Sequence, residues 1–225
     1  MCFGQQTGNF DKGRNIKKMT DDVKDLFYNS GCTFGPLVNG KLYTDYYPGL
    51  KGHQYMFLKV WEKGLVYFRD DVQEELLINY DIVGDKLLFN KFYSGGTYII
   101  ELNINDIEGF TISGHKFIKL TISEGSQETN AYYEVLYDGK VKLLLKWEKY
   151  ISKASDSNKD ISYLQKTFYI KNNTKLVKIN KRKSIISSLS DQARNIENYI
   201  KQNKFYVRTA EPEDFIELMI YYDSL

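Results

Sequence analysis

The chain of 225 residues has little proline, cysteine, histidine and arginine. Three prolines leave long stretches free to form unbroken strands or helices. Neither the two cysteines nor His53 and His115, about sixty residues apart, have the spacing of zinc ligands. Lysine supplies nearly all the positive charge, which argues against an arginine patch that reads bases. The net charge of +2 favours no class of partner.

Long apolar runs are missing too, and without a window of about 18 apolar residues we expect no transmembrane segment. Cys2-Phe3-Gly4 resembles the end of a secretory signal, with small residues one and three places before a cut after Gly4. The charged and apolar regions that should precede such a cut are absent. Cys2 and Cys32 could be bonded, free or, for Cys2, lipidated. These observations leave two expectations, an exported protein or, if the chain begins as printed, a cytoplasmic one.

Aromatic residues are abundant, with 19 Tyr and 13 Phe, and they favour half-buried pleated surfaces. Apolar runs such as Leu65–Phe68 and Glu75–Tyr80 alternate with turn signals such as Gly84-Asp85 and Ser113-Gly114. Between about residues 55 and 180 this spacing predicts roughly ten antiparallel strands. The pattern predicts a meander and leaves open whether its sheet is curved, forms a sandwich or forms a half-barrel.

The strongest single signal is a β-hairpin around Asp138-Gly139. A three-residue loop with Gly139 in the left-handed region would set Val135 opposite Val141 and Glu134 opposite Lys142. That register would place apolar side chains on one face and an ion pair on the other.

Helices are predicted at both ends of the chain. Residues 20–29 form a short helix in this interpretation, followed by turns and one short strand at 41–46. An apolar stripe at Leu189, Ala193, Ile196 and Ile200 predicts one tail helix, restarted near Ser190, and Glu211-Pro212 begins another. We expect an α+β fold with a lead-in at 1–54, an antiparallel β region at 55–180 and a helical tail at 181–225. One structural domain results, with the tail covering the open face of the sheet.

A further set of segments comprises Trp61–Phe89, Phe117-Ile118, Asn130–Leu145, Phe168–Ile170, Lys183–Ile186 and the ending Tyr221-Tyr222-Asp223-Ser224-Leu225. Together these segments resemble a family of exported proteins from Bacteroidetes to which no activity is assigned. The resemblance covers about residues 55–225. The resemblance implies a cleaved signal and a location in the periplasm or at the outer membrane, and it implies no site residues.

The sequence shows no catalytic constellation. A G-x-S-x-G elbow and a phosphate-binding glycine loop are both absent. Cys32 is the only candidate nucleophile, and a loop thiol explains it better. Adjacent acids such as Glu74-Glu75 point to opposite faces of a strand and cannot share a site. We therefore predict no catalytic residue, no cofactor and no metal.

Two surfaces remain as candidates for binding. Outward tyrosines can make a surface for protein or sugar, and the candidates are Tyr46, Tyr47, Tyr132 and Tyr133. A basic run could meet an anion, with the candidates Lys178, Lys181, Arg182 and Lys183. The main hypothesis is a non-enzymatic envelope protein that binds another protein, a glycan or a lipid, and not nucleic acid. The alternatives are a carrier of an apolar ligand within a curved sheet and a hydrolase with acids from distant strands.

Overall fold

The computed structural model describes residues 40–47, 49–57, 60–69, 72–93, 96–124, 127–153, 160–173 and 175–225. The helix expected at 20–29 and both cysteines lie outside these residues.

The described chain is mostly strand, followed by a helical tail. The strands are β1 Lys41–Leu42, β2 Glu62–Phe68, β3 Gln73–Asp81, β4 Lys86–Tyr93, β5 Gly96–Glu101, β6 Ile107–Ile112, β7 His115–Glu124, β8 Gln127–Asp138, β9 Lys142–Lys153, β10 Asp160–Lys171 and β11 Leu176–Lys178. The helices are α3 Arg182–Ser188, α4 Ala193–Gln202 and α5 Pro212–Asp223, with short 3₁₀ turns at Ile104–Asp106 and Ser190–Gln192. The predicted α+β class, mainly antiparallel β, is confirmed.

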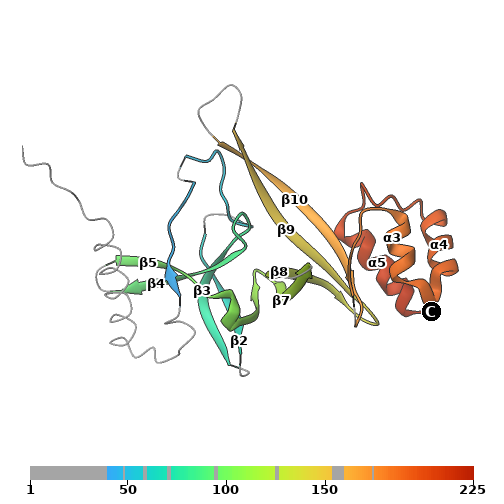
Figure 1. Ribbon diagram of the computed structural model, residues 1–225, viewed down its shortest axis with the longest axis horizontal. Helices are drawn as coiled ribbons and strands as arrows, with labels where there is room; N and C mark the ends of the chain where they lie inside the picture. Colours follow the sequence, from blue (N-terminus) through green and yellow to red (C-terminus); the bar gives the residue numbers. More distant parts are fainter. Residues whose placement is uncertain are drawn as a thin grey trace, which may run out of the picture.

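The strands form a single open sheet in the order β1-β5-β4-β3-β2-β6-β7-β8-β9-β10-β11 (Figure 1). All pairs of neighbouring strands are antiparallel. The order departs from a simple meander at two places: β1 pairs with β5 instead of β2, and after β5 the chain returns to place β6 on the free side of β2. The helices gather beside β9 and β10, at the end of the sheet that is far from β4 and β5 (Figure 1).

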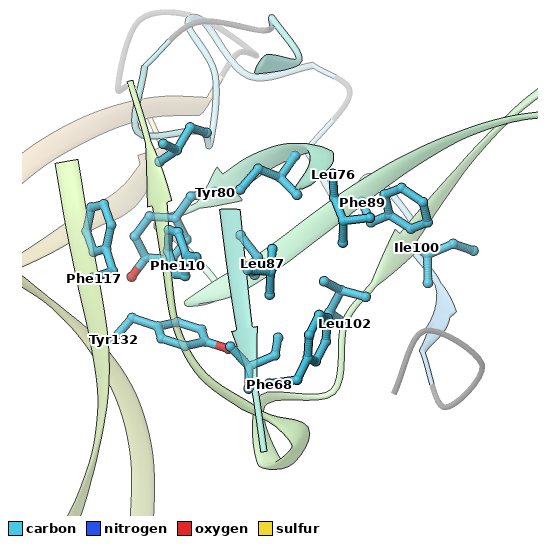
Figure 2. Packing of buried hydrophobic residues seen from close by; sticks show 14 of the residues in the cluster. Phe68, Leu76, Tyr80, Leu87, Phe89, Ile100, Leu102, Phe110, Phe117 and Tyr132 are labelled. Carbon is cyan, nitrogen blue, oxygen red and sulfur yellow. The ribbon is translucent and has the colours of Figure 1, made fainter. Parts of the chain in front are cut away.

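One face of the sheet is buried along its length because apolar side chains line up across the strands. A single row runs through the paired residues Val66, Phe110, Phe117, Glu134, Leu145 and Phe168. In the first half of the sheet, rings of Tyr80, Phe110, Phe117 and Tyr132 fill this face, with centroids 4.6–5.9 Å apart (Figure 2). Mostly edge-on packing of fully buried rings makes this a filled core.

In the second half of the sheet, the tail covers the same face. Leu145 and Phe168 from the sheet pack with Ile196 of α4 and with Phe215 and Leu218 of α5. Phe168 and Phe215 stack with centroids 4.2 Å apart. The first predicted tail helix is observed as α3 and α4, interrupted at Leu189, whose amide donates to the carbonyl of Ile185.

The predicted hairpin is present, but its register was wrong. Glu134 pairs with Leu145 instead of Lys142, and a bulge interrupts the ladder between Val135 and Tyr137. Gly139 is not in the left-handed region. The alternation of apolar and polar residues predicted the wrong register because both faces of β8 are covered here. Alternation then no longer distinguishes a buried face from a solvent-exposed one.

Glycine at position 139 instead leaves space for the end of α5. A Cβ built on Gly139 would lie only 1.8 Å from Oδ2 of Asp223, near the end of α5. The Asp223 carboxylate accepts the hydroxyl of Tyr137 at 2.8 Å and the backbone amide of Lys140 at 3.2 Å. Two separate sequence features, the Asp-Gly turn and the ending of the chain, therefore form one contact.

Candidate functional site

A groove of about 780 Å³ lies in the helical tail, lined by residues 180–182, 200–201 and 204–209. We call it the cationic groove after its five basic residues: Lys181, Arg182, Lys201, Lys204 and Arg208. They come from the start of α3, the end of α4 and the loop 203–210 that joins α4 to α5.

The start of α3 holds the first wall of the groove. The side chain of Ser184 accepts the amides of Asn180 and Lys181, both at 3.3 Å, and donates to the carbonyl of Lys181 at 2.6 Å. These bonds satisfy backbone groups that the helix itself leaves without partners. The backbone that carries Lys181 and Arg182 is thus fixed.

The end of α4 holds the second wall, through ion pairs at Glu197. A guanidinium nitrogen of Arg182 donates to Oε1 of Glu197 at 2.6 Å, and Nζ of Lys201 lies 3.5 Å from the same oxygen. Glu197 therefore ties α3 to α4 beside the groove. One acid between two cations leaves this side of the groove with a net positive charge.

The loop 203–210 supplies the third wall, and its side chains alternate between core and solvent. Phe205 points inward and meets Phe215 edge to face at 5.1 Å. Tyr206 is 68% exposed, while its carbonyl accepts the amides of Thr209 and Ala210 at 3.0 Å. Lys204 and Arg208 are exposed on either side of it. The anchored backbone therefore presents an aromatic ring flanked by two cations.

The electrostatics of the groove favour an anion. No acidic residue lines it, and Lys181, Lys204 and Arg208 form no ion pair with any residue that the structure describes. Unpaired cations in one concave surface raise the local concentration of anions. A second hollow of about 240 Å³, also lined by Lys204 and Tyr206, contains Asp214 and Glu217. The cationic groove is therefore more positively charged than this second hollow.

The structure divides the predicted basic patch. Lys181 and Arg182 line the groove, whereas Lys178 at the end of β11 and Lys183 on α3 are exposed but lie outside the lining. Sequence reasoning missed Lys201, Lys204, Tyr206 and Arg208. A signal was present, because the run from Lys201 to Arg208 interleaves basic residues with two aromatic rings.

The tyrosine surface expected from the sequence does not form as a unit. Tyr132 and Tyr133 are only 1% and 3% exposed, so their assignment to a binding surface was wrong. Tyr132 belongs to the ring cluster, and Tyr133 packs on the opposite face against Tyr169 at 5.3 Å. Both faces of β8 are covered, which the assumption of one ring in and one ring out did not foresee.

The other two candidate tyrosines lie after β1. Tyr46 is 66% exposed and holds the ammonium of Lys86 over its ring at 5.2 Å, and Tyr47 is half-buried. The side chain of Asp45 accepts the amide of Tyr47 at 2.9 Å. Tyr46 thus presents one ring to solvent, without a second exposed tyrosine from the predicted set beside it.

A buried acid, Glu134, forms a polar cluster within the core. Glu134, 5% exposed, accepts the indole N–H of Trp147 at 2.5 Å and lies 2.5 Å from Nδ1 of His115. These partners compensate the only acid in the apolar row across the sheet. His115, the first residue of β7, thus contacts Glu134 of the neighbouring strand β8.

Two acids, Asp85 of the β3–β4 turn and Glu101 at the end of β5, share a cavity of about 350 Å³ near β1. Asp85 accepts from the hydroxyl of Tyr80 and from Nζ of Lys146, and Glu101 lies 3.1 Å from both Lys41 and Lys86. Each carboxylate is thus already neutralised by lysine. This arrangement suits structural ion pairs better than proton transfer to a substrate.

Among the described residues, no group of three or more His, Cys, Asp or Glu side chains could hold a metal ion. None of the helices described is long and apolar enough to cross a membrane. Comparisons with protein-family models, with curated proteins and with solved structures found no match to this chain.

Proposed function

We propose that this protein is a non-enzymatic binding module that takes an anionic ligand in the cationic groove. The observation that carries the proposal is the lining itself, with five basic residues, no acid and an exposed aromatic ring at its edge. Location in the cell envelope, as the family resemblance implies, belongs to the same proposal.

The two alternative functions have weaker support. A carrier needs hollow space inside the curved sheet, but four buried rings pack against one another there. A hydrolase needs two carboxylates with different protonation roles. Asp85 and Glu101 share a cavity, but each is already paired with lysine.

Isothermal titration with inorganic tripolyphosphate tests the proposal. Removing two exposed cations, as in Lys204→Gln with Arg208→Gln, should weaken binding about tenfold or more at low salt, since charge-assisted contacts contribute about 1 kcal/mol or more each. Binding by the unaltered protein should also weaken as salt rises.

The matched control is Lys178→Gln with Lys183→Gln. It removes the same charge from the same end of the molecule but leaves the lining of the groove intact. It should change the affinity by about twofold at most, because exposed charges at a distance are screened. Equal losses in the two double variants, or no binding by the unaltered protein, would contradict the proposal.

A further inference from the structure

We infer that the anion is the headgroup of a membrane lipid, and that the loop 203–210 docks on an anionic bilayer with Tyr206 at the lipid interface. This inference rests on the proposed function and names the ligand of the same groove.

The first argument is the arrangement of side chains on the loop. Lys204, Tyr206 and Arg208 are exposed and alternate with Phe205, which is anchored on Phe215. An exposed tyrosine between two cations matches the chemistry of the bilayer interface, where aromatic rings occupy the headgroup level and cations meet phosphates. A soluble anion would need the cations but not the exposed ring.

The second argument is the composition of the groove beneath the cations. Ile200, Phe205 and Val207 give its lining an apolar part below a charged rim. A lipid headgroup carries a phosphate next to an apolar chain, so it complements both parts at once. A strongly hydrated polyanion would leave the apolar part without a partner.

The third argument is the direction of approach. The cations of α3 and α4 lie on one side of the loop, whereas Asp214 and Glu217 line the hollow that includes Ala210 and Tyr199. An anionic surface is attracted to the first side and repelled by the second. The bilayer therefore meets the groove with the start of α3 and the exposed ring of Tyr206.

Co-sedimentation with vesicles tests the inference. The full chain should bind vesicles of phosphatidylglycerol and phosphatidylcholine and should not bind vesicles of phosphatidylcholine alone. Lys204→Gln with Arg208→Gln should lower vesicle affinity about 25-fold, the effect expected for two cations near an anionic surface. Glu217→Gln, which removes a repelling charge, should raise it.

Substitutions of Tyr206 distinguish binding to a bilayer from binding to a soluble anion. Tyr206→Ala should lower vesicle affinity about fivefold, as expected for losing the partial burial of a ring, and should lower tripolyphosphate affinity clearly less, because the five cations that attract the anion are all kept. In Tyr206→Trp, the added indole fluorescence should shift to shorter wavelength on anionic vesicles, because the ring enters a less polar environment.

The outcomes distinguish the two proposals. Tripolyphosphate binding in the groove without vesicle binding would overturn the lipid inference and leave the anion-binding function standing. Equal vesicle affinity of the unaltered protein and Tyr206→Ala would also overturn the inference. Absence of tripolyphosphate binding by the unaltered protein would overturn the proposed function itself.

Discussion

At the scale of single residues, the close approach of neighbouring backbones decides which amino acid a position in this sheet can hold. Gly109 of β6 pairs with Tyr67 on one side and Ile118 on the other. A Cβ added there would lie 2.3 Å from the carbonyl oxygen of Phe117 and 3.4 Å from Cα of Ile118. The clash is with backbone, which cannot rotate away as a side chain can.

Gly109→Ala should therefore destabilise the fold strongly. We expect a loss of about 1–3 kcal/mol or more in the free energy of unfolding, as for overpacked cores. For a chain of this length, each kcal/mol corresponds to a fall of about 2–4 °C in Tm. Thermal unfolding followed by circular dichroism measures it.

Gly49→Ala is the matched control, because an added Cβ there meets no atom within 4 Å. It should leave Tm nearly unchanged. A similar Tm for both variants would mean that β6 and β7 separate without cost, against the packing described above.

At the scale of secondary-structure elements, the tail is attached to the sheet through a polar contact as well as through its apolar core. Asp223 receives hydrogen bonds from Tyr137 and from the amide of Lys140 in the β8–β9 turn. Its proximity also raises the pKa of the Tyr137 hydroxyl, since that hydroxyl donates to the carboxylate. The last residue of α5 thus contacts a turn that lies more than eighty residues earlier in the chain.

Asp223→Ala should loosen this turn. The variant removes the acceptor of both hydrogen bonds, so we expect faster hydrogen exchange in residues 137–142 and a lower Tm. The control is Asp138→Ala in the same turn, which removes only an exposed ion pair with Lys142 and should cost about 0–1 kcal/mol. Unchanged exchange in Asp223→Ala would show that apolar packing alone holds α5 in place.

Local patterns predicted these elements but not their contacts. The hairpin at Asp138-Gly139 and the helix at Pro212 follow from turn residues, proline placement and apolar spacing, and both are present. The contact of Asp223 with Gly139 joins residues far apart in the chain, which no local pattern specifies. The register of Glu134 failed for a related reason, since its partners His115 and Trp147 come from two other strands.

The candidate site was likewise predicted only in part. Lys181 and Arg182 stand in a basic run and were predicted as an anion-binding patch. Lys204 and Arg208 join them because α4 turns the chain back beside α3, through the ion pairs of Glu197. The groove is a product of the helix–helix contact, so the sequence run alone could define only one of its walls.

At the scale of the whole molecule, the abundance of buried tyrosine makes the stability of the fold vary with pH in the alkaline range. Burial raises the pKa of Tyr55, Tyr80 and Tyr132, whose rings lie in the core. It does the same for Tyr43 and Tyr133, and burial together with the bond to Asp191 raises the pKa of Tyr222 to about 12. Unfolding exposes these hydroxyls, which then ionise near pH 10.

The sign of the dependence follows from proton counts. Above about pH 10 the folded protein keeps phenolic protons that the unfolded chain releases, so stability is fully present below that pH and falls as pH rises. Lys149 acts in the opposite direction, because burial lowers its pKa and folding is then favoured as pH rises toward the ordinary lysine value. Six buried tyrosines outweigh one lysine.

Tyr222→Phe tests one member of this set. The hydroxyl of Tyr222 donates to Asp191 at 3.0 Å, so at neutral pH the variant should lose about 1.5–3 kcal/mol, the usual contribution of a bond to a charged acceptor. Between about pH 10 and 12, however, its stability should fall less steeply than that of the unaltered protein, because phenylalanine has no proton to release. Urea unfolding at pH 8 and pH 10.5, with tyrosinate absorbance as a second signal, measures both effects. An identical fall in the two proteins would mean that Tyr222 already ionises in the folded state, which its contact with the Asp191 carboxylate opposes.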